Sequence, residues 1–200
     1  MLPDEKVRAA ITALGERFCK SHRAMGLPVG AEDLHLSLCP MGKPERLRQP
    51  IEDALLEAAD AVRSSAFHIS LDSAMRFSAR DGQFPFVLCA DGHTNKLALQ
   101  LRKDIAAEQM RVSLQVSGVS SYLPHVVLLT GHGIEAIGES ISPIEWKVED
   151  FVLIRSFFGQ SRHEVVGRWP LDIKPEPEAC DMLDELANMS DLPDFTGHLV

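Results

Sequence analysis

The stretch Leu34-His35-Leu36-Ser37-Leu38-Cys39-Pro40-Met41-Gly42 decides how this sequence is interpreted. Its leucines alternate with residues of other kinds, and a period of two is typical of a half-buried β-strand. Side chains two positions apart on a strand project from the same face, so His35 and Ser37 should stand side by side. Pro40 and Gly42 then end the strand.

A second stretch repeats this arrangement. Residues 122–131, with the sequence YLPHVVLLTG, predict another short apolar strand that carries His125 near its start and ends at a glycine. An amphipathic helix pattern precedes each of the two histidine strands. The pair is a stronger signal than one His-x-Ser motif, because a short motif by itself often occurs by chance.

The two stretches together resemble the two-histidine phosphoesterases, which include the bacterial RNA 2′,3′-cyclic phosphodiesterases, often named 2′-5′ RNA ligases. Members of that family carry two His-x-Thr/Ser strands. Residues 35–38 followed by Met41-Gly42 match the first motif, and Tyr122-x-Pro124-His125 matches the second. The second match is incomplete, since Val127 stands where the family places a hydroxyl.

The resemblance extends over roughly residues 2–171, because segments around Trp146, at 151–156 and at 167–171 match the closing strands of the family. Relatives usually begin with an apolar strand before the first helix, whereas this chain begins Met1-Leu2-Pro3. We therefore expect the first strand to be missing and one strand edge of the first lobe to be unpaired.

The resemblance implies an α+β fold with two lobes, in which two antiparallel sheets flanked by helices surround a central cleft. Hydrophobic periodicity indicates a compatible order of elements. Asp81-Gly82 predicts a hairpin turn, and Thr94 is expected to cap the third helix. Helices are predicted at residues 3–26, at 44–63 and from 94 onward, and strands at 66–79, 84–90, 112–116, 122–131, 147–156 and 163–169.

Charge divides the chain into two parts. Residues 172–200 hold eight carboxylates and one lysine, a net charge of −7 out of −9, which leaves −2 for residues 1–171. We therefore expect one two-lobed domain at 1–171 followed by an acidic tail at 172–200. A nearly neutral body argues against broad nucleic-acid affinity, which needs clustered Lys and Arg, but it allows a local positive pocket for an RNA end.

The cysteines and the apolar stretches indicate in which cellular compartment the protein is expected. Cys19, Cys39, Cys89 and Cys180 are widely scattered and show no metal-ligand spacing. No stretch resembles a signal peptide, and none approaches the roughly 20 apolar residues of a membrane span. We expect a monomer in the reducing cytoplasm, without a cofactor or a membrane partner.

By the resemblance, His35 and His125 are the catalytic residues. Opening a cyclic phosphodiester requires a base for water and an acid for the leaving oxygen, and imidazole serves both because its unperturbed pKa is about 6.5. Which histidine takes which role is left open. Ser37 is the expected phosphate donor, whereas Val127 cannot donate.

Several other side chains are candidates for contact with the substrate. His163 stands near the position where many relatives have a tyrosine, and Arg155 is the best basic candidate for a phosphate. Aromatic side chains could stack on a base. These are Tyr122, Phe77, Phe84, Phe157 and Phe158.

The resemblance thus implies a metal-independent hydrolase that acts on 2′,3′-cyclic phosphates of RNA ends or nucleotides. One alternative is a catalytically weak or inactive relative that binds RNA ends or nucleotides, and Val127 favours it. A metal hydrolase fits poorly, because the two histidines lie 90 residues apart and have no nearby Asp or Glu at ligand spacing.

Overall fold

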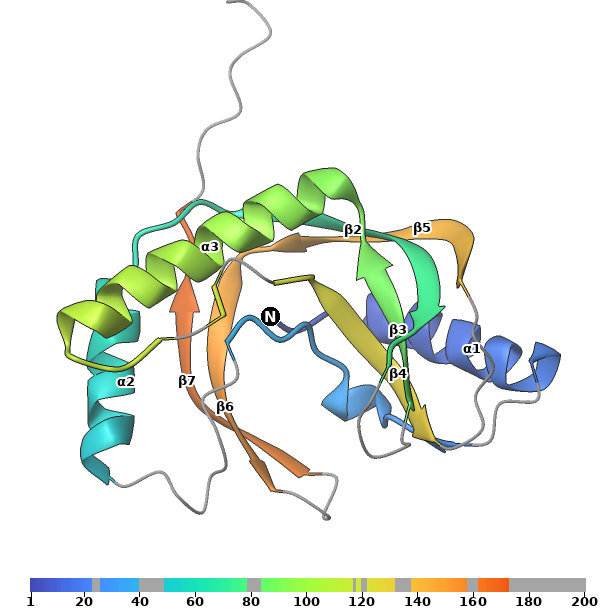
Figure 1. Cartoon of the computed structure of the whole chain (residues 1–200), viewed down its shortest axis with the longest axis horizontal. Helices are drawn as coiled ribbons and strands as arrows, with labels where there is room; N and C mark the ends of the chain where they lie inside the picture. The colour runs from blue at the N-terminus through green and yellow to red at the C-terminus, as the bar shows by residue number, and fades with distance from the viewer. Residues whose placement is uncertain are drawn as a thin grey trace, which may run out of the picture.

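The computed structural model describes residues 1–22, 26–39, 49–78, 84–116, 118–119, 122–131, 138–157 and 162–172. Within these residues the predicted α+β class with two antiparallel sheets is confirmed (Figure 1). The predicted turns at Met41-Gly42 and Asp81-Gly82, and the tail beyond Asp172, lie outside the described residues.

The helices are α1 (Glu5–Ser21), the short 3-10 helix η1 (Ala31–Asp33), α2 (Gln49–Ala61) and α3 (Gly92–Arg111). The strands are β1 (Leu27–Pro28), β2 (Phe67–Arg76), β3 (Phe84–Ala90), β4 (His125–Gly131), β5 (Gly138–Val148), β6 (Asp150–Phe157) and β7 (Arg162–Pro170).

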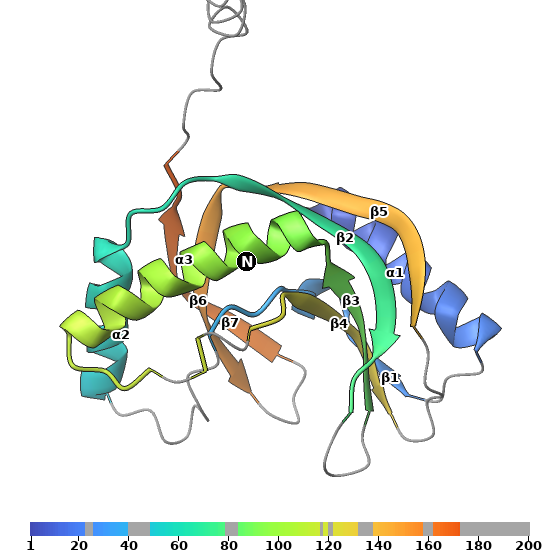
Figure 2. The same ribbon diagram turned by 45° about the horizontal axis from the view of Figure 1, so that its top comes forward.

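The larger sheet has the strand order β1-β4-β3-β2-β5, and β6 and β7 form a separate hairpin. Figure 2 shows β2 and β5 curving over the molecule. The register of β2 shifts between Leu71 and Ser73 against both of its neighbours, so Asp72 forms a bulge. A bulge bends a strand and increases its twist, which accounts for the curvature.

Helix α1 covers one face of the larger sheet. Asp4 caps it by accepting a hydrogen bond from the Val7 backbone N–H at 2.8 Å. The predicted apolar stripe is buried, and the Phe18 ring packs edge-on against Phe86 of β3, with ring centroids 5.1 Å apart. The helix ends at Ser21, before the predicted Gly26.

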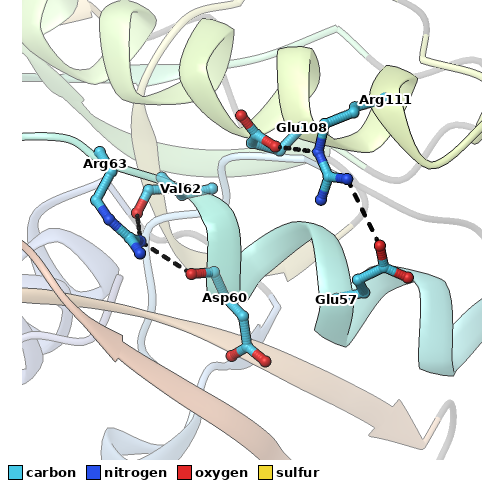
Figure 3. A network of polar contacts seen from close by, with 6 residues as sticks. All are labelled: Glu57, Asp60, Val62, Arg63, Glu108 and Arg111. Carbon is cyan, nitrogen blue, oxygen red and sulfur yellow. Dashed lines mark hydrogen bonds and ion pairs between the residues drawn. The ribbon is translucent and has the colours of Figure 1, made fainter.

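Helices α2 and α3 pack against each other (Figure 3). Arg111 reaches Glu57 across the interface at 3.6 Å and Glu108 on its own helix at 2.7 Å. Arg63 donates to the carbonyl of Asp60, in the last turn of α2, and to that of Val62, just after the helix. Exposed ion pairs contribute little, typically below about 1 kcal/mol, so the buried apolar residues of both helices hold the pair together.

Two local predictions were wrong around α3. Asp91 is its N-cap, since its carboxylate accepts from the Thr94 backbone N–H, while the Thr94 hydroxyl accepts from the Ser70 N–H at 2.9 Å. Residues 112–116 form no strand. Ser113 has a φ of 65° and Leu114 donates back to the Gln109 carbonyl, which is a helix-ending turn.

The sequence interpretation also missed β5 and merged its end with β6. Pro143 lies within β5, and proline argues against a central strand because it has no N–H for the ladder. β5 is an edge strand of the sheet, and residues 141–143 oppose the Asp72 bulge. Proline is tolerated there because neither an edge nor a bulge needs that donor.

Candidate active site

The two histidine stretches lie side by side. Leu36 pairs antiparallel with Val126, and both side chains are completely buried. Because neighbours along a strand point to opposite faces, the residues that flank this pair share the other face. The register places His35 opposite Val127 and Ser37 opposite His125. Four predicted site residues therefore come together on one surface.

Each ring is oriented by the backbone of its own strand. His35 Nδ1 lies 2.7 Å from the Asp33 carbonyl oxygen, and His125 Nδ1 lies 2.8 Å from the Leu123 carbonyl oxygen. A carbonyl can only accept, so Nδ1–H donates in both cases. In the neutral ring Nε2 then keeps its lone pair and is left for proton transfer. Both stretches repeat the same spacing, a carbonyl two residues before the histidine.

His35 and His125 are diagonal neighbours across the paired stretches. The backbones of such residues lie about 7–8 Å apart, within reach of long or aromatic side chains. This spacing allows both imidazoles to approach one small anionic group. The far side of His125 is closed by Phe77, whose ring packs edge-on with centroids 4.9 Å apart.

A cavity of about 470 Å³ opens beside His35. The first histidine stretch, α2, the end of α3 and both strands of the small sheet line it, and His125 is not part of its wall. Its apolar side includes Leu55, Ile105 and the stacked rings of Phe151 and Trp169. Its polar side includes His35, Ser37, Glu52, Arg155 and His163.

Partial burial affects the protonation of His35. Desolvation lowers its pKa below the usual 6.5, the hydrogen bond to Asp33 opposes this shift, and the neighbouring His163 adds to it. The neutral form of His35 is therefore favoured at neutral pH, with its lone pair on Nε2.

His163, on β7, lies directly against His35. The ring centroids are 5.0 Å apart and the planes meet at 79°. His163 Nδ1 is 3.4 Å from Asp33 Oδ1, a contact that becomes an ion pair when the imidazole is protonated. A third imidazole, from the β6–β7 sheet, therefore lies in contact with the first histidine motif.

Arg155 lines the cavity, but its positive charge is already paired with two carboxylates. It pairs with Glu52 of α2 at 2.6 Å and with Glu164 of β7 at 3.2 Å. A phosphate that approached this guanidinium would compete with two carboxylates. Arg155 therefore joins α2 to the small sheet as the structure stands.

Tyr122, which precedes the second histidine, is hydrogen-bonded to the first motif. Its hydroxyl donates to the Ser37 carbonyl at 2.7 Å, and burial raises its pKa above the ordinary value. The guanidinium of Arg102 lies over its ring, 5.0 Å from the centroid. Of the other aromatic candidates, Phe84 lies under Arg76, and Phe158 is outside the described residues.

Arg102 was not singled out from the sequence. It is 5% exposed and donates to the Leu38 carbonyl and, at 2.9 Å, to the Gly118 carbonyl. The available signal was its spacing, because Ala98 and Ile105 bury the same face of α3. Arg102 holds the end of the first motif against α3.

Met1 lies along the other edge of the first motif. Its backbone nitrogen donates to the Leu36 carbonyl at 3.0 Å, and the Leu36 N–H donates to the Met1 carbonyl at 2.9 Å. The strand edge expected to be open is therefore paired at Leu36.

Two kinds of feature are absent from the part of the chain that the structure describes. No group of three or more His, Cys, Asp or Glu side chains there could hold a metal ion. No helix there is both long and apolar enough to span a bilayer.

The fold of this chain is similar to that of several proteins of known structure. No protein-family model and no curated protein matches the sequence. Among solved structures, apo LigT from E. coli is 25% identical with a TM-score of 0.64, covering 86% of this chain and 93% of LigT. A crystal structure described as a phosphoesterase is 26% identical, with a TM-score of 0.63 and coverage of 86% and 94%. TT0787 of Thermus thermophilus shares the fold at 23% identity, with a TM-score of 0.61 and coverage of 87% and 96%.

The likeness to LigT extends over nearly its whole length, and it agrees with the two histidine strands and their spacing. In its fold and in its two histidine stretches, the chain is similar to LigT-like proteins of the two-histidine phosphoesterase family.

Proposed function

We propose that this protein is a metal-independent phosphodiesterase that opens 2′,3′-cyclic phosphates on RNA ends or nucleotides. The observation that supports this most is the placement of His35 and His125, on one face and diagonally across a strand pair. Each ring has Nδ1 committed to a carbonyl and Nε2 available. LigT has been solved with 3′-AMP and with phosphate, which supports a nucleotide phosphate as the ligand of this fold.

The proposed reaction uses one imidazole on each side of phosphorus. One Nε2 accepts a proton from water as the new P–O bond forms, and the other, protonated, donates to the ribose oxygen as its P–O bond breaks. The lowered pKa of His35 suits it to accept the proton in this direction. Ser37 is the hydroxyl available to donate to a non-bridging oxygen whose charge increases.

The direct test is an assay of the purified protein with EDTA present. The substrates are the four nucleoside 2′,3′-cyclic phosphates and an RNA that ends in a cyclic phosphate. We expect a phosphomonoester product at a rate that EDTA leaves unchanged. Turnover that appears only when a divalent cation is restored would contradict the metal-independent mechanism.

A second candidate function, binding with weak or no turnover, is favoured by Val127. Its half-buried side chain lies opposite His35 and two residues from His125, and it offers no donor. Loss of a hydrogen bond to a charged group costs about 1.5–3 kcal/mol, which corresponds to one to two decades in rate. In the assay above, a cyclic nucleotide that binds without being consumed would support this alternative.

Val127→Thr tests what the missing donor costs. Threonine exchanges one methyl for a hydroxyl and keeps the β-branched shape, so the strand should be preserved. We expect kcat to rise about tenfold if the hydroxyl reaches an oxygen that gains charge in the transition state. Val127→Ala is the control, because it changes the side chain without adding a donor. Lower stability together with lower activity in Val127→Thr would mean that this position requires an apolar side chain.

A further inference from the structure

We propose that His163 is a third imidazole of the cleft, held beside His35 by the Asp33 carboxylate, and that it binds the substrate phosphoryl group as a cation. This inference rests on the proposed function and adds a substrate contact to the same site. It also explains how a cleft that lacks a donor at position 127 can still hold an anion.

The first argument is that Asp33 contacts both histidines, His35 through its backbone and His163 through its side chain. Its carbonyl oxygen accepts from His35, and its carboxylate faces His163 Nδ1 at 3.4 Å. One residue at the end of η1 therefore positions both rings. The Asp33 and His163 side chains are only 16% and 19% exposed, so this contact is sheltered from water and less screened than a surface pair.

The second argument is the direction of the remaining donor. Nδ1 is the His163 nitrogen that contacts Asp33, at 3.4 Å from Oδ1, and Nε2 is on the other side of the ring. His163 lines the same cavity as His35 and Ser37. In the protonated ring both nitrogens donate, so Asp33 takes one N–H and the other is available to a phosphate oxygen.

The third argument concerns the surrounding charges. The charged groups near the two rings are Asp33, which contacts His163, the cavity-lining Arg155 and Glu52, and the Met1 amino group, which acts electrostatically on His35. Arg155 is matched by Glu52 and by Glu164. When His163 carries a proton, it is a cationic donor in contact with His35, and its charge lowers the pKa of His35.

The chain contains a matched control. His22 Nε2 lies 3.5 Å from the Glu139 carboxylate, and the His22 ring stacks on Phe18 at 5.4 Å. This pair repeats the chemistry of Asp33, His163 and His35, a histidine between a carboxylate and an aromatic ring, but it lies outside the cavity. His22→Phe therefore removes an equivalent imidazole without affecting the cleft.

The experiment titrates inorganic phosphate into the wild type, His163→Phe, His163→Gln and His22→Phe, followed by NMR at several pH values between about 5.5 and 8, a range that spans the ordinary histidine pKa. Comparing variants at each pH removes the effect of phosphate ionisation. We expect His163→Phe to lose about tenfold in phosphate affinity at low pH, and less as pH rises and the wild-type imidazole loses its proton. His163→Gln, which keeps an N–H near the Nε2 position, should recover part of the affinity without the pH dependence. His22→Phe should match the wild type.

Two results would overturn the proposal: unchanged phosphate affinity in His163→Phe, or an equal loss in His22→Phe. If the chain turns over cyclic nucleotides, His163→Phe should raise KM more than it lowers kcat. A fall in kcat with phosphate affinity intact would instead make His163 a positioning residue that acts through His35, and would also overturn it. The titration needs no turnover, so a failure of the proposed hydrolysis is distinguishable from a failure of this inference.

Discussion

Replacing either His35 or His125 with alanine is expected to lower kcat/KM for a nucleoside 2′,3′-cyclic phosphate by about 10²- to 10⁴-fold, the usual contribution of a positioned acid or base. The register places the two rings on one face of the paired stretches, and in the proposed mechanism they act on the same phosphorus. The double variant should therefore be no slower than the slower single variant, because acid and base work as a unit. Steady-state rates of the three variants measure this.

The folded state should survive these substitutions, because both side chains lie on the face opposite the buried Leu36 and Val126. His68→Ala is a suitable control, since His68 is an exposed strand histidine on β2. Circular dichroism and thermal denaturation should give similar curves for all of them. Full activity in either single variant of the cleft would rule out the two-histidine mechanism.

Replacing Arg102 with methionine is expected to lower the free energy of unfolding by about 1–3 kcal/mol, the cost of leaving a buried carbonyl without its donor. The carbonyl concerned is that of Leu38, and Gly118 loses its partner as well. Since Leu38 adjoins Ser37, we also expect a loss of activity. Arg102→Lys should not rescue the protein, because an ammonium cannot reproduce a planar fork that reaches two carbonyls.

Urea denaturation measures this change, and Lys103→Met provides the comparison. Lys103 is the next residue on α3 and is exposed, so its replacement removes a charge without touching either carbonyl. Equal unfolding midpoints for the two variants would show that the bonds of Arg102 contribute nothing net to stability.

The outcome of the sequence interpretation depended on how local each feature was. The stripe of α1 and the shared face of His35 and Ser37 follow from periodicity, which a short segment expresses by itself. The bounds of β3 follow from the Asp-Gly pairs on either side of a short apolar run. β5, which the sequence interpretation missed, contains Pro143, and only the bulge at Asp72 and the edge position make a proline acceptable there.

The sequence by itself determined the candidate catalytic residues, since the two histidine stretches, and the valine at position 127 of the second, are visible without coordinates. Only the tertiary structure decided that Leu36 meets Val126, that Asp33 holds both His35 and His163, and that Arg102 binds the end of the first motif. The physical reason is range. Periodicity reports which face of a segment is buried, whereas the partner across that face depends on strand register and helix packing between segments far apart in the chain.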